Sequence, residues 1–284
     1  MSRQGRDAQV ECYALDDARA SANKSDFTDT KSFQLTRFVM EGIFMAVNVQ
    51  TLGPRLADRK LFLIAAVAFP LIVLIGYFRS YYGSFLFDVP SVANSLVHAH
   101  GLVMSVWVLY FTAQALLIRT KKVKLHMTLG MAGIGLAATV VVVGMATAYD
   151  AQLVRGAAPP GVNPHAFFIL PVSDMLLFVT FFAGAIYYRK RKIEHKSLML
   201  LTAIAFLPAA LFRLPVVAPE YAMLWAFGTP AMLAAATLGW HTWKHGKLNR
   251  VFAGGVALVF AAIPMRFVVM GSNSWLTFVG WLAP

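Results

Sequence analysis

Seven long apolar blocks fill most of the sequence between residues 61 and 270. Each has about 18–23 residues, and short polar stretches separate one block from the next. An α-helix rises ~1.5 Å per residue and the hydrocarbon core of a bilayer is ~30 Å thick, so each block is long enough to cross it. The blocks are Leu61–Phe78, Gly101–Ile118, Met127–Ala148, Ala166–Tyr188, Ser197–Val217, Tyr221–Trp240 and Val251–Met270. The pattern predicts an all-α, polytopic integral membrane helical bundle, with seven transmembrane helices in residues 58–284.

The composition excludes an ordinary soluble domain. The chain is 58% apolar and only 13% charged, whereas soluble domains carry about 25% charged residues. The high apolar content also excludes a disordered chain. With a single cysteine, Cys12, the protein cannot contain a disulfide framework or a cysteine-based zinc or iron–sulfur site.

The positive charge sets the expected orientation. Twelve of the Lys and Arg residues lie in three loops, 119–126, 189–196 and 241–250, whereas the alternate loops contain only Arg79 and Arg155. The positive-inside rule therefore predicts that these three loops are cytoplasmic, with the N-terminus inside and the C-terminus outside. The basic residues of these three loops, which account for the net charge of +12, are thus expected to contact anionic lipid headgroups. No nucleic-acid partner is expected.

The seven histidines suggest a site for haem. At the outer ends of predicted spans lie His98, His100 and His165. At the inner starts of two spans lie His126 and His195, and at the inner end of the sixth span lie His241 and His245. Alternate helices thus offer an outer pair, His100 with His165, and an inner pair, His126 with His195. Two stacked haems b, each with two axial imidazoles, would form an electron path across the membrane. The alternative interpretation is that these histidines are interfacial side chains near helix ends.

The outer histidines also allow a different kind of site. His98 and His100 point about 200° apart in a helix, but in an extended segment both could bind one metal. With His165 as a third ligand, they would form an outer-face copper or zinc site.

Two charged residues stand inside the predicted spans, where an unpaired charge is costly. Asp174 and Arg213 both lie in the outer half, and we expect them to form an ion pair. Arg213 would alternatively hold a haem propionate. Arg266, which follows Pro264 in the seventh span, is a candidate member of the same outer pocket.

Three short motifs carry a resemblance to known proteins. They are His98-Ala99-His100-Gly101, Leu125-His126-x-x-Leu129-Gly130 and His195-Lys196-x-Leu198-Met199-Leu200-Leu201. The set resembles an uncharacterised family of bacterial multi-spanning membrane proteins over roughly residues 60–245, so we expect a bacterial inner-membrane protein. The layout of candidate ligands is also similar to that of di-haem transmembrane cytochromes of the cytochrome b-561 group. There, one haem lies between the second and fourth of these helices and the other between the third and fifth.

The leading hypothesis is therefore a b-type haem electron-transfer protein, with a quinone or another redox partner. A second hypothesis is a transporter or small-molecule sensor whose outer cavity is lined by His100, Asp174, Arg213 and Tyr82. An outer metal site and an accessory membrane subunit are further alternatives.

Residues 1–57 differ from the rest, because they are rich in Ser, Asp, Ala and Thr and lack sustained apolar periodicity until residue 38. They are expected to form a mostly disordered cytoplasmic tail, and no apolar signal-peptide core follows the first basic residues. We also expect translation of the native protein to begin at Met45. N-terminal sequencing of the native protein tests this, and a peptide from residues 5–30 would contradict it.

Overall fold

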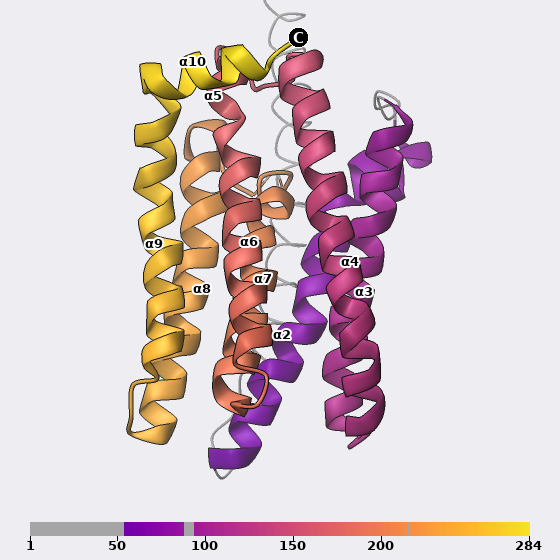
Figure 1. Ribbon diagram of the computed structural model, residues 1–284, viewed down its shortest axis with the longest axis vertical. Helices are drawn as coiled ribbons and strands as arrows, with labels where there is room; N and C mark the ends of the chain where they lie inside the picture. Colours follow the sequence, from indigo (N-terminus) through magenta and orange to yellow (C-terminus); the bar gives the residue numbers. More distant parts are fainter. Residues whose placement is uncertain (1–53, 88–93, 215) are drawn as a thin grey trace, which may run out of the picture. The chain divides into compact units, whose positions relative to one another are not determined.

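The computed structural model describes residues 54–87, 94–214 and 216–284 (Figure 1). Met45 and all but the last four residues of the expected tail lie outside this part. Seven helices are long and apolar enough to cross a membrane, and the described residues contain no β-strand. These helices are α2 (Pro54–Tyr77), α3 (Ser95–Arg119), α4 (Val123–Tyr149), α6 (Ile169–Tyr187), α7 (Lys192–Leu211), α8 (Ala222–His245) and α9 (Arg250–Met270). The predicted all-α, seven-span membrane architecture is confirmed.

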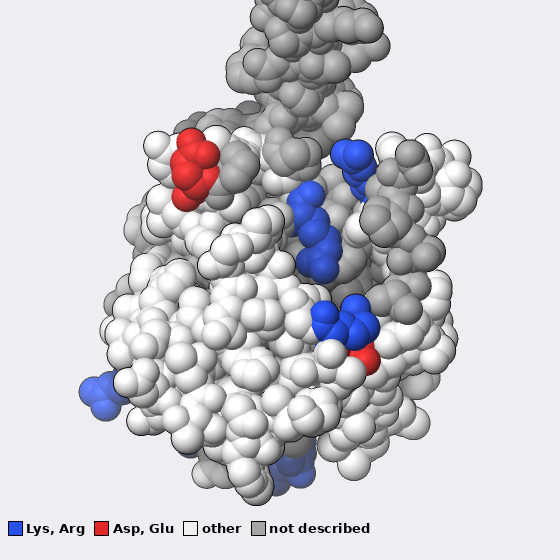
Figure 2. Space-filling model, turned by 90° about the horizontal axis from the view of Figure 1, so that it is seen from above, with Lys and Arg blue, Asp and Glu red and all other residues white. Residues whose placement is uncertain are grey.

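The two ends of the bundle differ in chemistry. The three Lys- and Arg-rich loops follow α3, α6 and α8 and lie at one end, which we name the basic end. Two short helices, α5 (Pro164–Phe167) and α10 (Asn273–Leu282), lie at the other, which we name the C-terminal end (Figure 1). Seen from the C-terminal end, the described surface is mostly uncharged, with a few scattered charged side chains (Figure 2).

Several helices begin earlier than the apolar blocks predict, among them α3 and α7, which carry candidate histidines. α3 begins at Ser95, because the side chain of Asn94 accepts a hydrogen bond from the Val97 backbone amide and caps the helix. α7 begins at Lys192, and Glu194 in its first turn suits the positive end of the helix dipole. As a result His100 and His195 both lie within helices.

Helix α7 forms the centre of the bundle. It packs against α2, α6, α8 and α9, and most of its residues from Ser197 to Leu211 are buried. A helix that is apolar all round is typical of such a position. Small side chains such as Ala203, Ala205 and Ala210 let the neighbouring helices approach closely.

An aromatic cluster joins three helices at mid-bundle. The Trp107 ring of α3 is fully buried and lies 5.1 Å from that of Phe178 of α6 in an edge-to-face arrangement. Phe178 in turn stacks on Phe206 of α7, with ring centres 4.7 Å apart. Such aromatic pairs add to the stability that their burial gives.

The crossing of α2 and α7 leads to a prediction. A Cβ atom at Gly76 would lie 2.6 Å from the backbone oxygen of Ala210, so the two helices can stay this close only with glycine there. We expect Gly76→Ala to lower the free energy of unfolding by about 1–3 kcal/mol, because α2 and α7 must separate. Thermal unfolding in detergent measures this. Gly239→Ala, in α8 with no atom within 4 Å of the added carbon, is the control and should not destabilise; equal losses in both variants would contradict the prediction.

Candidate functional site

The rings of His126 and His195 meet near the basic end. His126 lies in the first turn of α4 and His195 in the first turn of α7. Their ring centres are 6.3 Å apart and their planes are nearly perpendicular, at 79°. We name these two residues the histidine pair.

A hydrogen bond fixes the protonation of His195. Its Nδ1 lies 2.8 Å from the backbone oxygen of Ala185 in α6. A carbonyl oxygen can only accept, so Nδ1 carries the proton and donates it. In the neutral ring Nε2 then keeps a lone pair, which is the form of histidine that binds a metal.

His126 lies against another helix. The backbone of Gln114 in α3 interacts with its ring, and its Nδ1 is buried without a hydrogen-bond partner. Buried polar atoms are nearly always hydrogen-bonded, so this nitrogen is a candidate to bind a ligand.

A polar network supports the His126 side of the site. The Gln114 amide nitrogen donates to the Tyr110 hydroxyl at 2.7 Å, and this hydroxyl donates to the backbone oxygen of Leu129 at 2.5 Å. The amide oxygen of Gln114 is buried and has no partner. Sequence reasoning missed Gln114 and Tyr110, whose spacing of four residues on α3 was the only available signal.

The outer histidines do not meet in the same way. The His100 ring lies beside Gly144 of α4 and close to the Met175 side chain of α6, and it interacts electrostatically with Arg213. His165 lies in α5, a separate short helix that ends at Phe167 before α6 begins, and its backbone oxygen accepts a hydrogen bond from Trp275 of α10. In the described part of the chain, the two residues expected to form the outer pair therefore have different neighbours.

The remaining histidines are dispersed. His98 is exposed and packs on the Tyr81 ring, with ring centres 5.9 Å apart. His241 and His245 lie together on α8, with ring centres 4.4 Å apart. Across residues 54–87, 94–214 and 216–284, no group of three or more His, Cys, Asp or Glu side chains is placed to hold a metal ion. The three-histidine metal site expected at His98, His100 and His165 is not assembled there.

Asp174, the acidic residue within the spans, has a different partner from the one expected. Asp174 forms its ion pair with Arg266, whose Nη2 lies 2.5 Å from Oδ1 and whose side chain is only 4% exposed. Arg266 also lies over the Phe227 ring, 4.6 Å from its centre. The expected Asp174–Arg213 pair is thus replaced, because α9 continues past Pro264 and packs on α6.

Arg213 lies elsewhere because α7 ends at Leu211. Its exposed side chain donates to the backbone oxygen of Ala209 at 2.5 Å and lies over the Tyr77 ring, 4.4 Å from the ring centre. Tyr82, another residue of the expected outer cavity, shares a hydrogen bond of 2.6 Å with Ser105. The polar groups proposed for a transporter cavity are therefore largely occupied by other partners.

A small cavity adjoins Arg266. Its volume is about 20 Å³, and Pro208, Pro230 and Ile204 are among the residues around it. The Nε of Arg266 is buried and lacks a hydrogen-bond partner. A cavity of this size holds about one water molecule, so a single water here would satisfy the remaining donor.

Comparisons with known proteins give no family for this chain. No protein-family model, no curated protein sequence and no solved structure matches it. The function must therefore be argued from the geometry.

The ion pair gives the second prediction from the structure. Asp174→Asn leaves Arg266 charged and unpaired in the bundle, so we expect a loss of about 3–5 kcal/mol in the free energy of unfolding. Arg213→Gln, the matched control, should change stability little, because Arg213 is exposed. Thermal unfolding of both variants in detergent measures the difference. The double variant D174N/R266M should recover much of the loss, and an equal loss in Arg213→Gln would contradict the assignment.

Proposed function

We propose that this chain is a membrane-bound b-type haem protein that transfers electrons, with the iron held between His126 and His195. One observation carries the proposal. The structure brings two imidazoles together: the Nδ1 of His195 bonds to a backbone carbonyl, which leaves its Nε2 with a lone pair, and the buried Nδ1 of His126 has no hydrogen-bond partner. Ligating histidines characteristically donate their second nitrogen in this way, which fixes the ring and raises its basicity.

The separation of the rings would allow one iron to be held between them. About 2 Å from metal to each nitrogen and about 1 Å from nitrogen to ring centre give roughly 6 Å between ring centres. The observed separation is 6.3 Å. The perpendicular ring planes do not affect axial binding, since each ring contributes only one nitrogen.

The number of ligands favours haem over a bare metal ion. Structural zinc sites need four protein ligands and catalytic zinc sites need three, whereas a haem iron takes four nitrogens from its own macrocycle and needs only two axial ligands. The histidine pair supplies two. Gly130, one turn after His126, has open space where its side chain would be, which leaves room for a flat group.

The basic end suits the anionic side groups of a haem. Arg191 and Lys196 lie within four residues of His195, and Lys122 and Lys124 within four residues of His126. Their charges would balance propionates at the membrane surface. When bound, a haem would supply one-electron chemistry, and the protein would hold it through the two rings, with His195 oriented by its bond to Ala185.

The location follows from the charge. We place the basic end in the cytoplasm by the positive-inside rule, with the bacterial inner membrane as the site of action. The likeness to the cytochrome b-561 group then extends to one haem, at the inner level. Electrons would be exchanged at the cytoplasmic surface with a membrane quinone or a redox protein.

An optical spectrum tests the proposal. Protein expressed with haem supplied and purified in detergent should show a Soret band and about one haem per chain. His126→Ala and His195→Ala should each abolish it, while the control variants His98→Ala and His165→Ala should keep it. A wild-type protein that is colourless, but whose thermal unfolding shows that it is folded, would overturn the proposal. A Soret band that survives both His126→Ala and His195→Ala would also overturn it.

A further inference from the structure

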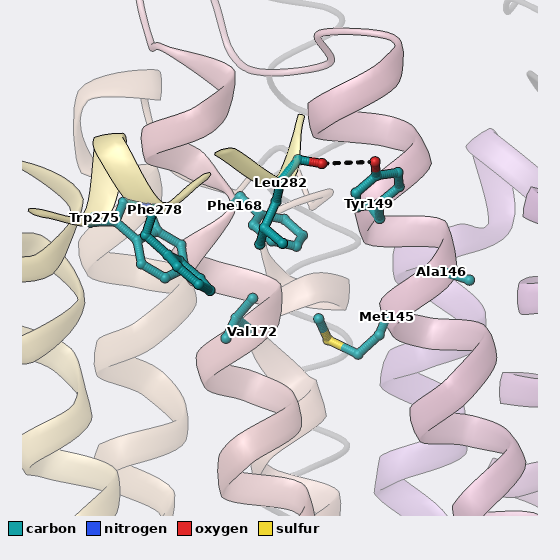
Figure 3. A pocket seen from close by; sticks show the side chains of 8 residues that line it. All are labelled: Met145, Ala146, Tyr149, Phe168, Val172, Trp275, Phe278 and Leu282. Carbon is teal, nitrogen blue, oxygen red and sulfur yellow. Dashed lines mark hydrogen bonds between the residues drawn. The ribbon is translucent and has the colours of Figure 1, made fainter. Parts of the chain in front are cut away.

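A lateral groove opens between α4 and α6 at the C-terminal end, and α10 crosses above it (Figure 3). Its volume is about 430 Å³, which is in the range of ligand sites, about 300–1,000 Å³. The walls and roof include Ala146 and Tyr149 of α4, Val172 of α6, and Trp275, Phe278 and Leu282 of α10. We name this space the lateral groove.

The lining of the groove offers an occupant only apolar contacts. Its two hydrogen-bonding side chains are already engaged with the protein. The Tyr149 hydroxyl donates to the backbone oxygen of Leu282 at 2.9 Å, and the Trp275 indole nitrogen donates to that of His165 at 3.0 Å. A quinone ring would leave its carbonyl oxygens without donors here, so the chemistry favours a hydrocarbon chain.

The groove is continuous with the surface that faces lipid. Val142 lies one turn before Ala146 on α4 and is 67% exposed, and Leu176 lies one turn after Val172 on α6 and is 62% exposed. Residues four apart share a helix face. An acyl chain lying along these exposed side chains can therefore enter the groove without crossing a polar region.

Arg155 lies six residues after Tyr149, a lining residue of the groove, and is paired with Asp150. Asp150 follows Tyr149 directly and accepts hydrogen bonds from the Arg155 Nε at 2.8 Å and from the Asn94 amide at 2.9 Å. The Arg155 side chain is 33% exposed, and among the described residues only its Nε has a partner. Its terminal nitrogens are thus available to a phosphate oxygen.

We propose that the lateral groove binds one acyl chain of a phospholipid from the adjacent leaflet, with its phosphate at Arg155. The chain would fill space that otherwise leaves the walls without packing partners. It would also complete the small apolar cluster formed by Ala148, Leu153, Phe168 and Val279. The site is independent of the histidine pair, which lies at the basic end.

Helix α10 closes the lateral groove on the side of the membrane surface. Val279 is fully buried against the bundle while Trp281 is 80% exposed, so the helix is amphipathic. An exposed tryptophan at this level is typical of the membrane interface. The lipid chain would therefore lie under a helix that is itself anchored among the headgroups.

A stability measurement on the full chain tests the lipid site. Thermal unfolding is measured in detergent with and without added phosphatidylglycerol. The wild-type Tm should rise by roughly 3–6 °C when the lipid is about tenfold above its Kd. Ala146→Phe, which fills the groove, should abolish the rise, and Arg155→Gln should reduce it. Ala138→Phe, at another exposed position of α4, should keep it.

Further probes identify the occupant. A lysophospholipid, which has one acyl chain, should reproduce the rise in Tm. An equal rise in wild type, Ala146→Phe and Ala138→Phe would overturn the proposal, because the lipid would then act on the whole surface. A rise with a short-chain ubiquinone and none with phospholipid would replace the acyl chain by a quinone.

Discussion

The hydrocarbon interior of a membrane offers no hydrogen-bond donors or acceptors, and this constraint shapes the whole molecule. Several hydroxyl groups within the spans bond to carbonyls of their own helix, as Ser105 does to Gly101 and Thr147 to Val143. The Arg266 side chain enters the bundle only together with Asp174. Against this background the few buried polar atoms without partners are informative. Among them is the Nδ1 of His126, one of the two residues proposed to hold the haem.

Sequence alone predicts the spans well, because twenty consecutive apolar residues are a strong signal that needs no tertiary information. It also predicts that His126 and His195 begin neighbouring inner turns. It could not predict the bond from His195 to Ala185, because any residue type supplies the same backbone carbonyl. The prediction paired Asp174 with Arg213, whereas the structure pairs it with Arg266. The position of Arg213 depends on where α7 ends, and helix ends are the least certain part of such a prediction. The lateral groove arises from the path of α10, which no local pattern encodes.

The bundle divides its tasks between its ends. The basic end carries the loop charges and the histidine pair, while the C-terminal end carries the lateral groove and the short helices α5 and α10. Between them, α7 and the aromatic cluster around Trp107 and Phe178 form a densely packed middle. The two proposals concern different ends of the bundle, so the redox proposal and the lipid proposal are tested separately.

Three helices contain proline at a common depth: Pro208 in α7, Pro230 in α8 and Pro264 in α9. Pro208 and Pro230 line the small cavity beside Arg266, and so does Ile263, the neighbour of Pro264. Each proline removes one backbone hydrogen bond and so lowers the bending stiffness of its helix at that point. Because the three prolines lie at the same level of the bundle, α7, α8 and α9 are all easier to bend at that level.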